Sequence, residues 1–255
     1  MLELSVSAEL RAGVGTELNF YMRVTLFFLL FLSLCGNSLA SNKECVVLLH
    51  GLARVSNSMA ELERKLDRSG FLAVNITYPS RRDEIELLAE EAIGRGLSAC
   101  GEQEVSKVHF VTHSLGGILV RQYLEREPLS QLGRVVMLGP PNQGTALVDR
   151  LRQVPGWTLL GPAADVLGTG PDSIISKLGP VQFELGVIAG DVNVNPLAAL
   201  FLQGENDSVV TVESTRVAGM DEHLVLPVIH TIMMRNNLLI DHTIHYLKTG
   251  NFIPQ

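Results

Sequence analysis

One short stretch of this sequence places a serine at a sharp corner between a strand and a helix. The apolar run 108–111 predicts a buried strand, and apolar residues recur at helical spacing from Leu115 until Pro128 closes the pattern. Between them lies the hexapeptide 112–117, Thr-His-Ser-Leu-Gly-Gly, with Ser114 near its centre. A buried strand that turns directly into a helix is typical of a parallel sheet with crossover helices.

The same alternation runs through the chain from residue 45 onward. Strands are predicted at 46–49, 71–76, 105–111, 134–138, 185–190 and from 224 onward, and helices at 59–66, 85–93, 115–124 and 240–247. Ser58 and Glu61 have the spacing of a capping box for the first helix. The pattern predicts an α/β fold with a mostly parallel central sheet of about six strands and helices on both faces. Functional groups are expected beyond the carboxyl ends of the strands.

Residues 1–40 differ from the rest of the chain. The run 24–34 is almost entirely apolar, follows Met22 and Arg23, and precedes a small-residue site at 38–41. This order is typical of a secretory signal peptide, which we expect at about 22–40 with cleavage near Ala40. The mature domain would then be 41–255 and would be periplasmic or secreted.

Residues 1–21 carry three glutamates against the single Arg11, a balance that signal peptides avoid. We therefore expect translation to start at Met22 rather than at Met1. A genuine extension before a membrane anchor is one alternative, although the apolar run is short for crossing a bilayer. Lipid attachment at Cys35 is another, and it is disfavoured because Leu34 is bulkier than the residue that such processing prefers.

The charge balance limits the partners that the chain can bind. The formal net charge is −7, and residues 1–40 hold three acidic and two basic residues, so the mature domain carries −6. An acidic chain without a basic run lacks the electrostatic footprint of a nucleic-acid-binding protein. The histidine and cysteine spacings that hold zinc are absent from the sequence, so we predict no metal and no cofactor.

Gly and Pro residues repeatedly break the strand–helix rhythm in the segment 141–182. A loop of this length in a compact domain is usually functional, so we interpret the segment as lid-like or as a wall of a binding cleft. Trp157, the only tryptophan, serves there either as a packing anchor or as a substrate contact.

Ser114 lies where the nucleophile-elbow motif G-x-S-x-G exposes a serine hydroxyl above a sheet, although Thr112 occupies the first glycine position. A serine hydroxyl is a weak nucleophile, so it needs a base, an orienting carboxylate and backbone N–H groups that stabilise an oxyanion. Leu115, directly after the serine, supplies one N–H group. Leu52 supplies the other, because Gly51 lets the backbone turn close to the cleft.

Two carboxylates are candidates for the acid. Asp191 directly follows the strand 185–190, whereas Asp207 lies in a turn before a pair of valines. A carboxylate that must reach back over the sheet edge needs a turn to carry it, which favours Asp207.

The candidate base must follow the acid and stand on the side of the sheet that carries Ser114. His230 follows the predicted last strand, 224–229, and is therefore the predicted base. Three other late histidines fit less well, one preceding that strand and two in the closing helix, where we expect solvated side chains: His223, His242 and His245. His113 and His50 are interpreted as structural.

Several of these motifs together resemble the bacterial lipase/esterase branch of the α/β-hydrolase superfamily. They are His-Gly-Leu at 50–52, the elbow at 112–117, Pro-Asn-Gln-Gly-Thr at 141–145, the Asp207 turn and the dipeptide at 230–231. The resemblance covers nearly all of 41–255 and implies a minimal α/β-hydrolase fold. It implies Ser114 as nucleophile, Asp207 as acid, His230 as base, and the N–H groups of Leu52 and Leu115 as oxyanion hole. Thr112 and Ser208 stand where the family frequently has glycine.

The implied strand order also bears on the cysteines. Cys45 stands at the amino end of one strand, and Cys100 stands just before the neighbouring strand that leads to Ser114. An oxidising compartment permits such a pair to form a disulfide. The resemblance therefore favours a Cys45–Cys100 disulfide over two separate thiols.

These features predict an exported serine hydrolase of the esterase/lipase type that cleaves carboxylic esters through an acyl-enzyme. Small-molecule or lipid esters are the expected substrates, with transient contact to a membrane or lipid surface. An amide or thioester hydrolase, and a non-catalytic binding protein on the same fold, are the alternatives.

Overall fold

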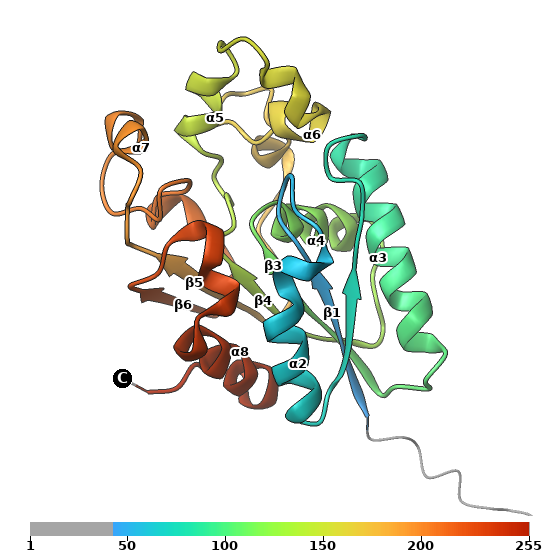
Figure 1. Cartoon of the computed structure of the whole chain (residues 1–255). Coiled ribbons are helices and arrows are strands. Elements are labelled where there is room, and N and C mark those ends of the chain that lie inside the picture. The colour runs from blue at the N-terminus through green and yellow to red at the C-terminus, as the bar shows by residue number, and fades with distance from the viewer. Residues whose placement is uncertain (1–42, 255) are drawn as a thin grey trace, which may run out of the picture. The chain divides into compact units, whose positions relative to one another are not determined.

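The computed structural model describes residues 43–254, so the predicted signal peptide, its cleavage site and the choice of start codon lie outside the described residues. Six strands in this range form one parallel sheet in the order β2-β1-β3-β4-β5-β6 (Figure 1). They are β1 (Glu44–Leu49), β2 (Leu72–Ile76), β3 (Lys107–His113), β4 (Leu132–Leu138), β5 (Leu185–Gly190) and β6 (Glu222–Leu226). The predicted α/β fold class is confirmed, and every strand pair is parallel.

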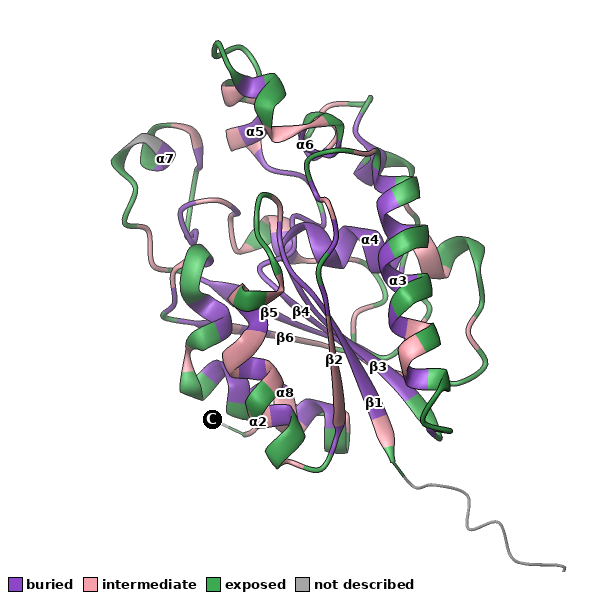
Figure 2. Cartoon of the chain, turned by 45° about the vertical axis from the view of Figure 1, so that its right-hand side comes forward, coloured by how far each residue is buried: buried purple, intermediate pink, exposed green. Residues whose placement is uncertain are grey.

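Helices cover both faces of the sheet. α3 (Ile85–Gly101) and α4 (Leu115–Arg126) pack together on one face, and α2 (Ala60–Arg68) and α8 (Asn237–Thr249) lie on the other (Figure 1). Within β1, Val47 belongs to the core cluster under α3 and α4, whereas its neighbour Val46 belongs to the cluster under α2 and α8. Burial on both faces explains the uninterrupted apolar runs of the strands (Figure 2).

The remaining helical elements are short. They are η1 (Ser56–Met59), α5 (Ala146–Leu151), η2 (Trp157–Leu160), α6 (Pro162–Asp165), η3 (Ile174–Lys177), α7 (Pro196–Phe201), η4 (Glu213–Thr215) and η5 (His230–Arg235). Four of these, α5, η2, α6 and η3, lie in the segment 141–182, beyond the carboxyl ends of the strands (Figure 1). No helix in the described part of the chain is long and apolar enough to cross a membrane.

Four local predictions are wrong. The capping box does not form, because the Ser58 hydroxyl donates to the Val55 carbonyl at 2.8 Å and α2 simply continues from η1. The last strand ends at Leu226 rather than at residue 229, since Pro227 has no N–H to donate to a neighbouring strand.

The other two wrong predictions are that His242 is solvated and that His223 precedes the last strand. His242 is only 4% exposed, because the C-terminal tail packs on α8 and the Ile253 N–H donates to its Nδ1 atom at 3.3 Å. His223 lies within β6 rather than before it.

A disulfide joins Cys45 of β1 to Cys100 in the last turn of α3, with the two Cα atoms 5.9 Å apart. Cys45 lies opposite Val108 in the pairing of β1 with β3, so the bridge lies at the amino ends of the strands. The disulfide and Ser114 therefore lie at opposite ends of the strands.

Candidate active site

Ser114 occupies the corner between β3 and α4 with φ +53° and ψ −119°, a strained conformation for a residue other than glycine. Neighbouring hydrogen bonds hold it there. The Ser114 N–H donates to the Leu138 carbonyl at 2.9 Å, and the Gly117 N–H donates to the Ser114 carbonyl at 3.0 Å. A serine strained in this way at a strand–helix turn has the geometry of a nucleophile elbow.

Two glycines let the loops after β1 and β3 approach each other. A Cβ atom on Gly51 would lie 3.2 Å from the Cβ of Ser114. A Cβ atom on Gly116 would lie only 2.7 Å from the Leu49 carbonyl oxygen, closer than a side chain can come to the backbone. The two loops are therefore in direct contact at the serine.

The predicted oxyanion donors stand on either side of this contact. Leu115 begins α4, so its N–H group is one of those that a helix leaves without an internal partner. Leu52 follows Gly51, and its N–H group makes no hydrogen bond to any residue within 43–254. Two free N–H groups on adjoining loops can stabilise an oxyanion that forms between them.

Asp207 and His230 meet beyond the carboxyl ends of β5 and β6. The His230 Nδ1 atom lies 2.7 Å from Asp207 Oδ2, and the His230 N–H donates to the Asp207 carbonyl at 3.0 Å. The second carboxylate oxygen accepts the N–H groups of Val209 at 3.0 Å and Val210 at 2.8 Å. Both side chains are buried. The structure thus brings Asp207 to His230, whereas Asp191 is exposed.

Two further glycines make room for this pair. A Cβ atom on Gly139 would lie 3.1 Å from both Asp207 Oδ2 and His230 Nδ1, and one on Gly190 would lie 2.9 Å from the Asp207 Cβ. Sequence reasoning assigned neither glycine a role. The available signal was their position at the carboxyl ends of two strands, where function was expected.

His113 joins the elbow to the base. Its Nε2–H group donates to the His230 carbonyl at 3.0 Å, and the two ring centroids are 4.7 Å apart. Burial, helped by the nearby His230, lowers the pKa of His113 well below its usual value. The Ser114 hydroxyl makes no hydrogen bond to a described residue. A hydrogen bond between a nucleophile and its base often forms only when substrate binds.

His50 holds the loop that carries Leu52. Its Nδ1–H group donates to the Gly51 carbonyl at 2.8 Å, and its Nε2 atom accepts the Tyr78 N–H at 3.3 Å. The ring also stacks on Tyr78, with centroids 4.1 Å apart. Burial lowers the pKa of His50, which favours the neutral form of this histidine in the folded protein.

The lowered pKa values of His50 and His113 predict that the fold loses stability in acid. Each has a lowered pKa in the folded state, so below about pH 6.5 the unfolded chain binds a proton that the folded chain does not. The stabilising contribution of the neutral histidines is therefore complete above about pH 6.5 and is lost as the pH drops. Urea unfolding between pH 7 and pH 5 measures the slope of this loss. His50→Gln should make the slope shallower, and an unchanged slope would contradict the assignment.

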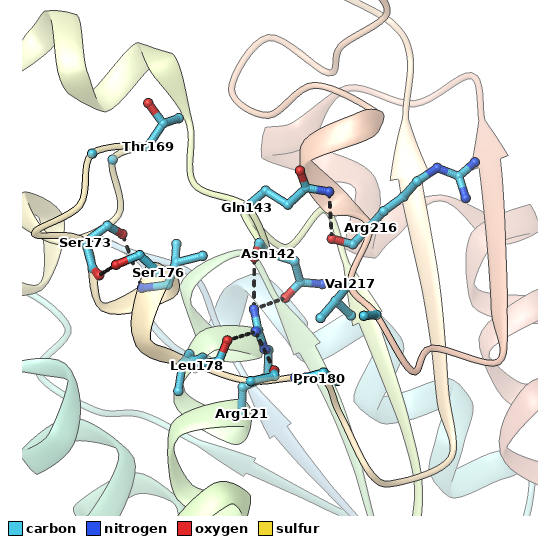
Figure 3. Close-up of a pocket in the computed structure, with 15 residues that line it drawn as sticks. Arg121, Asn142, Gln143, Thr169, Ser173, Ser176, Leu178, Pro180, Arg216 and Val217 are labelled. Carbon is cyan, nitrogen blue, oxygen red and sulfur yellow. Dashed lines mark hydrogen bonds between the residues drawn. The ribbon is translucent and has the colours of Figure 1, made fainter.

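Arg121 of α4 anchors the segment 141–182 to the rest of the domain (Figure 3). The side chain is 4% exposed, and its guanidinium donates to the carbonyl oxygens of Asn142 at 3.0 Å, Leu178 at 3.4 Å and Gly179 at 3.2 Å. Burial lowers the pKa of Arg121 to about 10. A cavity of about 380 Å³ lies beside Arg121. The arginine that lines it therefore already donates its hydrogen bonds to backbone carbonyls.

Trp157 serves as a packing anchor in this segment. It is 9% exposed, and its indole N–H donates to the Asp165 carboxylate within the same segment.

Arg121→Lys is expected to loosen this segment. A lysine ammonium cannot span the three carbonyls that the planar guanidinium reaches, so we expect a loss of about 2 kcal/mol in the free energy of unfolding. Urea unfolding gives the value, with Arg126→Lys on the exposed end of α4 as the matched control, expected within about 0.5 kcal/mol of wild type. Equal losses in both variants would contradict the anchoring role.

The sheet order, the serine elbow after β3 and the Asp–His pair beyond β5 and β6 define this domain as an α/β-hydrolase fold. Solved lipases and esterases share it. The mature form of a Bacillus licheniformis lipase has a TM-score of 0.61 and 21% identity, over 83% of this chain and 94% of its own. A thermophilic esterase from Thermogutta terrifontis has a TM-score of 0.58 and 12% identity, over 82% and 91%.

A metagenomic carboxyl esterase is similar at a TM-score of 0.58 and 17% identity, over 76% of this chain and 65% of its own. No family model and no curated protein matches the sequence. The expected resemblance to bacterial lipases and esterases is therefore confirmed at the level of the fold.

Proposed function

We propose that this protein is an exported serine hydrolase that cleaves carboxylic esters through an acyl-enzyme. The proposal is supported by a strained Ser114 and a buried Asp207–His230 pair beyond the carboxyl ends of the strands, joined by the contact of His113, the neighbour of Ser114, with the His230 carbonyl. The fold shared with lipases and esterases supports ester cleavage. The disulfide and the signal-like stretch at about 22–40 support export.

In the proposed reaction, the Ser114 Oγ atom attacks the ester carbonyl while His230 Nε2 takes the hydroxyl proton. Asp207 accepts the Nδ1–H bond, which fixes the tautomer of His230 and stabilises its charged form. The N–H groups of Leu52 and Leu115 stabilise the oxyanion. His230 then gives its proton to the departing alcohol, and a water molecule that it activates releases the acid from the serine.

Labelling with a fluorophosphonate probe tests this proposal directly. The chain is expressed with its own leader, purified after export, and also assayed on matched short 4-nitrophenyl esters, anilides and thioesters. Covalent labelling together with the fastest turnover on the esters is the expected result. A protein that is neither labelled nor active would favour a binding role, and faster turnover of anilides or thioesters would reassign the substrate class.

A further inference from the structure

A cavity of about 670 Å³ begins at Ala53, the residue after the oxyanion donor Leu52. Arg54 lines it from the loop after β1, and Arg81 and Arg82 line it from the loop after β2. Both loops leave the carboxyl edge of the sheet, as Ser114 does, because β1 pairs in parallel with both β2 and β3. The cavity is therefore next to the proposed site of ester cleavage.

The loops that form this cavity are fixed to each other and to the segment above them. The Ala53 N–H donates to the Ser80 hydroxyl at 3.0 Å. On the other side, a Cβ atom on Gly161 would lie 1.9 Å from the Arg81 carbonyl oxygen. The segment 141–182 therefore packs directly against the loop after β2. The wall of the cavity is thus held in place before any ligand arrives.

The three arginines form no close ion pair with a carboxylate of the described residues. Within residues 43–254, the ion pairs shorter than 4 Å involve other residues and leave out Arg54, Arg81 and Arg82. This positive cluster stands in a chain whose net charge is −7. The side chains of Arg81 and Arg82 make no hydrogen bond to a described residue, whereas Arg121 donates to three backbone carbonyls.

The charge also lies close to the reacting groups. Arg54 Nη2 is 3.5 Å from the carbonyl oxygen of Thr231, the residue after the proposed base. This contact joins the loop after β1 to the segment that begins with His230.

Apolar side chains complete the rim of the cavity. Leu159, 76% exposed, and Val55, 56% exposed, both line it beside the arginines. Large exposed apolar side chains next to unpaired positive charge fit a ligand that is itself part apolar and part anionic.

We propose that this cavity binds an anionic group of the ester substrate, a phosphate or a carboxylate, so that the preferred substrates are amphiphilic esters with negative charge near the scissile bond. The inference rests on the proposed ester hydrolysis and adds its substrate class. Guanidinium groups bind phosphate and carboxylate oxygens in pairs, which gives both attraction and orientation. Arg81 and Arg82 hold the anion, and Leu159 and Val55 contact the apolar part.

Two matched pairs of soluble esters test the proposal. One pair, 4-nitrophenyl butyrate and 4-nitrophenyl hemiglutarate, places the charge on the acyl side. The other pair, dibutyrylglycerol and dibutyryl-phosphatidylglycerol below its micelle concentration, places it on the alcohol side. In at least one pair, kcat/KM for the anionic ester should exceed that for the neutral ester by about tenfold, and the gain should shrink as NaCl rises from about 0.02 to about 0.5 M.

The double variant Arg81→Gln/Arg82→Gln should abolish this preference, mainly through KM, while neutral esters are cleaved within about twofold of the wild-type rate. Arg68→Gln, an exposed arginine at the end of α2, is the matched control and should keep the preference. If the double variant abolishes the preference in only one of the two ester pairs, that pair shows whether the anion belongs to the acyl side or to the alcohol side of the substrate.

Equal kcat/KM within both pairs, or a preference that survives the double variant or high salt, would overturn the inference while leaving ester hydrolysis standing. Failure of the proposed function is distinguishable, because the wild-type protein would then cleave none of the four esters and would not react with the fluorophosphonate probe.

Discussion

Replacement of Ser114 by alanine is expected to lower kcat/KM for 4-nitrophenyl butyrate by about 10⁴-fold or more, because no other group can form the acyl-enzyme. The fold should be unaffected, since the Ser114 hydroxyl makes no hydrogen bond to any residue in 43–254. Ester assays and a thermal melt measure the two effects. Ser130→Ala, which changes an exposed serine after α4, is the matched control and should retain full activity.

A second variant at this position separates strain from chemistry. Ser114→Gly should be as inactive as Ser114→Ala but more stable than it by about 1 kcal/mol, because glycine adopts φ +53° without steric cost. Ester cleavage retained in either variant would exclude Ser114 as the nucleophile. Equal stability of the two variants would show that the elbow stores no strain.

The next largest effect is expected for Asp207→Asn, which should lower kcat by about 10³- to 10⁴-fold with little change in KM. The asparagine amide can donate to His230 Nδ1, so it stabilises the tautomer in which Nε2 carries the hydrogen and cannot take the serine proton. Its carbonyl oxygen can still accept the N–H groups of Val209 and Val210, which should preserve the turn. Steady-state kinetics and urea unfolding together test this expectation.

Asp191→Asn is the control for this variant, because Asp191 is the other carboxylate that follows β5. It is exposed, so we expect its replacement to change kcat by less than about twofold. If Asp191→Asn were inactive and Asp207→Asn active, the acid would be misassigned.

Local sequence was sufficient to locate the elbow. The strand, the serine and the helix are consecutive, so an apolar run followed by helical spacing places Ser114 without any knowledge of distant residues. Thr112 departs from the motif, yet it fits because residue 117 has no side chain, and a Cβ atom there would lie 3.3 Å from the Thr112 hydroxyl. The prediction that Leu115 supplies an oxyanion N–H group also needed only local sequence, since this residue follows the serine directly.

The strand pattern was equally informative about the fold class. Both faces of β1 are buried, Val46 under one helix layer and Val47 under the other, so the run could not alternate with polar residues. The ends of the strands and the burial of individual side chains were predicted less well from the sequence. Pro227 ended β6 early, and His242 became buried because the C-terminal tail returns over α8.

The partners of the serine were only in part open to sequence reasoning. Chain order and turn chemistry favoured Asp207 and His230, but their 2.7 Å contact depends on the pairing of β5 with β6 and on the space left by Gly139 and Gly190. No local sequence pattern indicates such a contact, because the glycines that make room for it are far apart in the chain.

The sequence by itself therefore determined the α/β class and the serine at its strand–helix corner, since both depend on neighbouring residues and on burial. The tertiary structure decided which acid meets the base, how the two oxyanion loops touch, and where Arg54, Arg81 and Arg82 gather. Those arginines belong to two loops that parallel strand pairing brings to one edge of the sheet. Their common cavity exists only once the strands have paired, because the order of the strands in the sheet, and not local preference, sets which loops are neighbours.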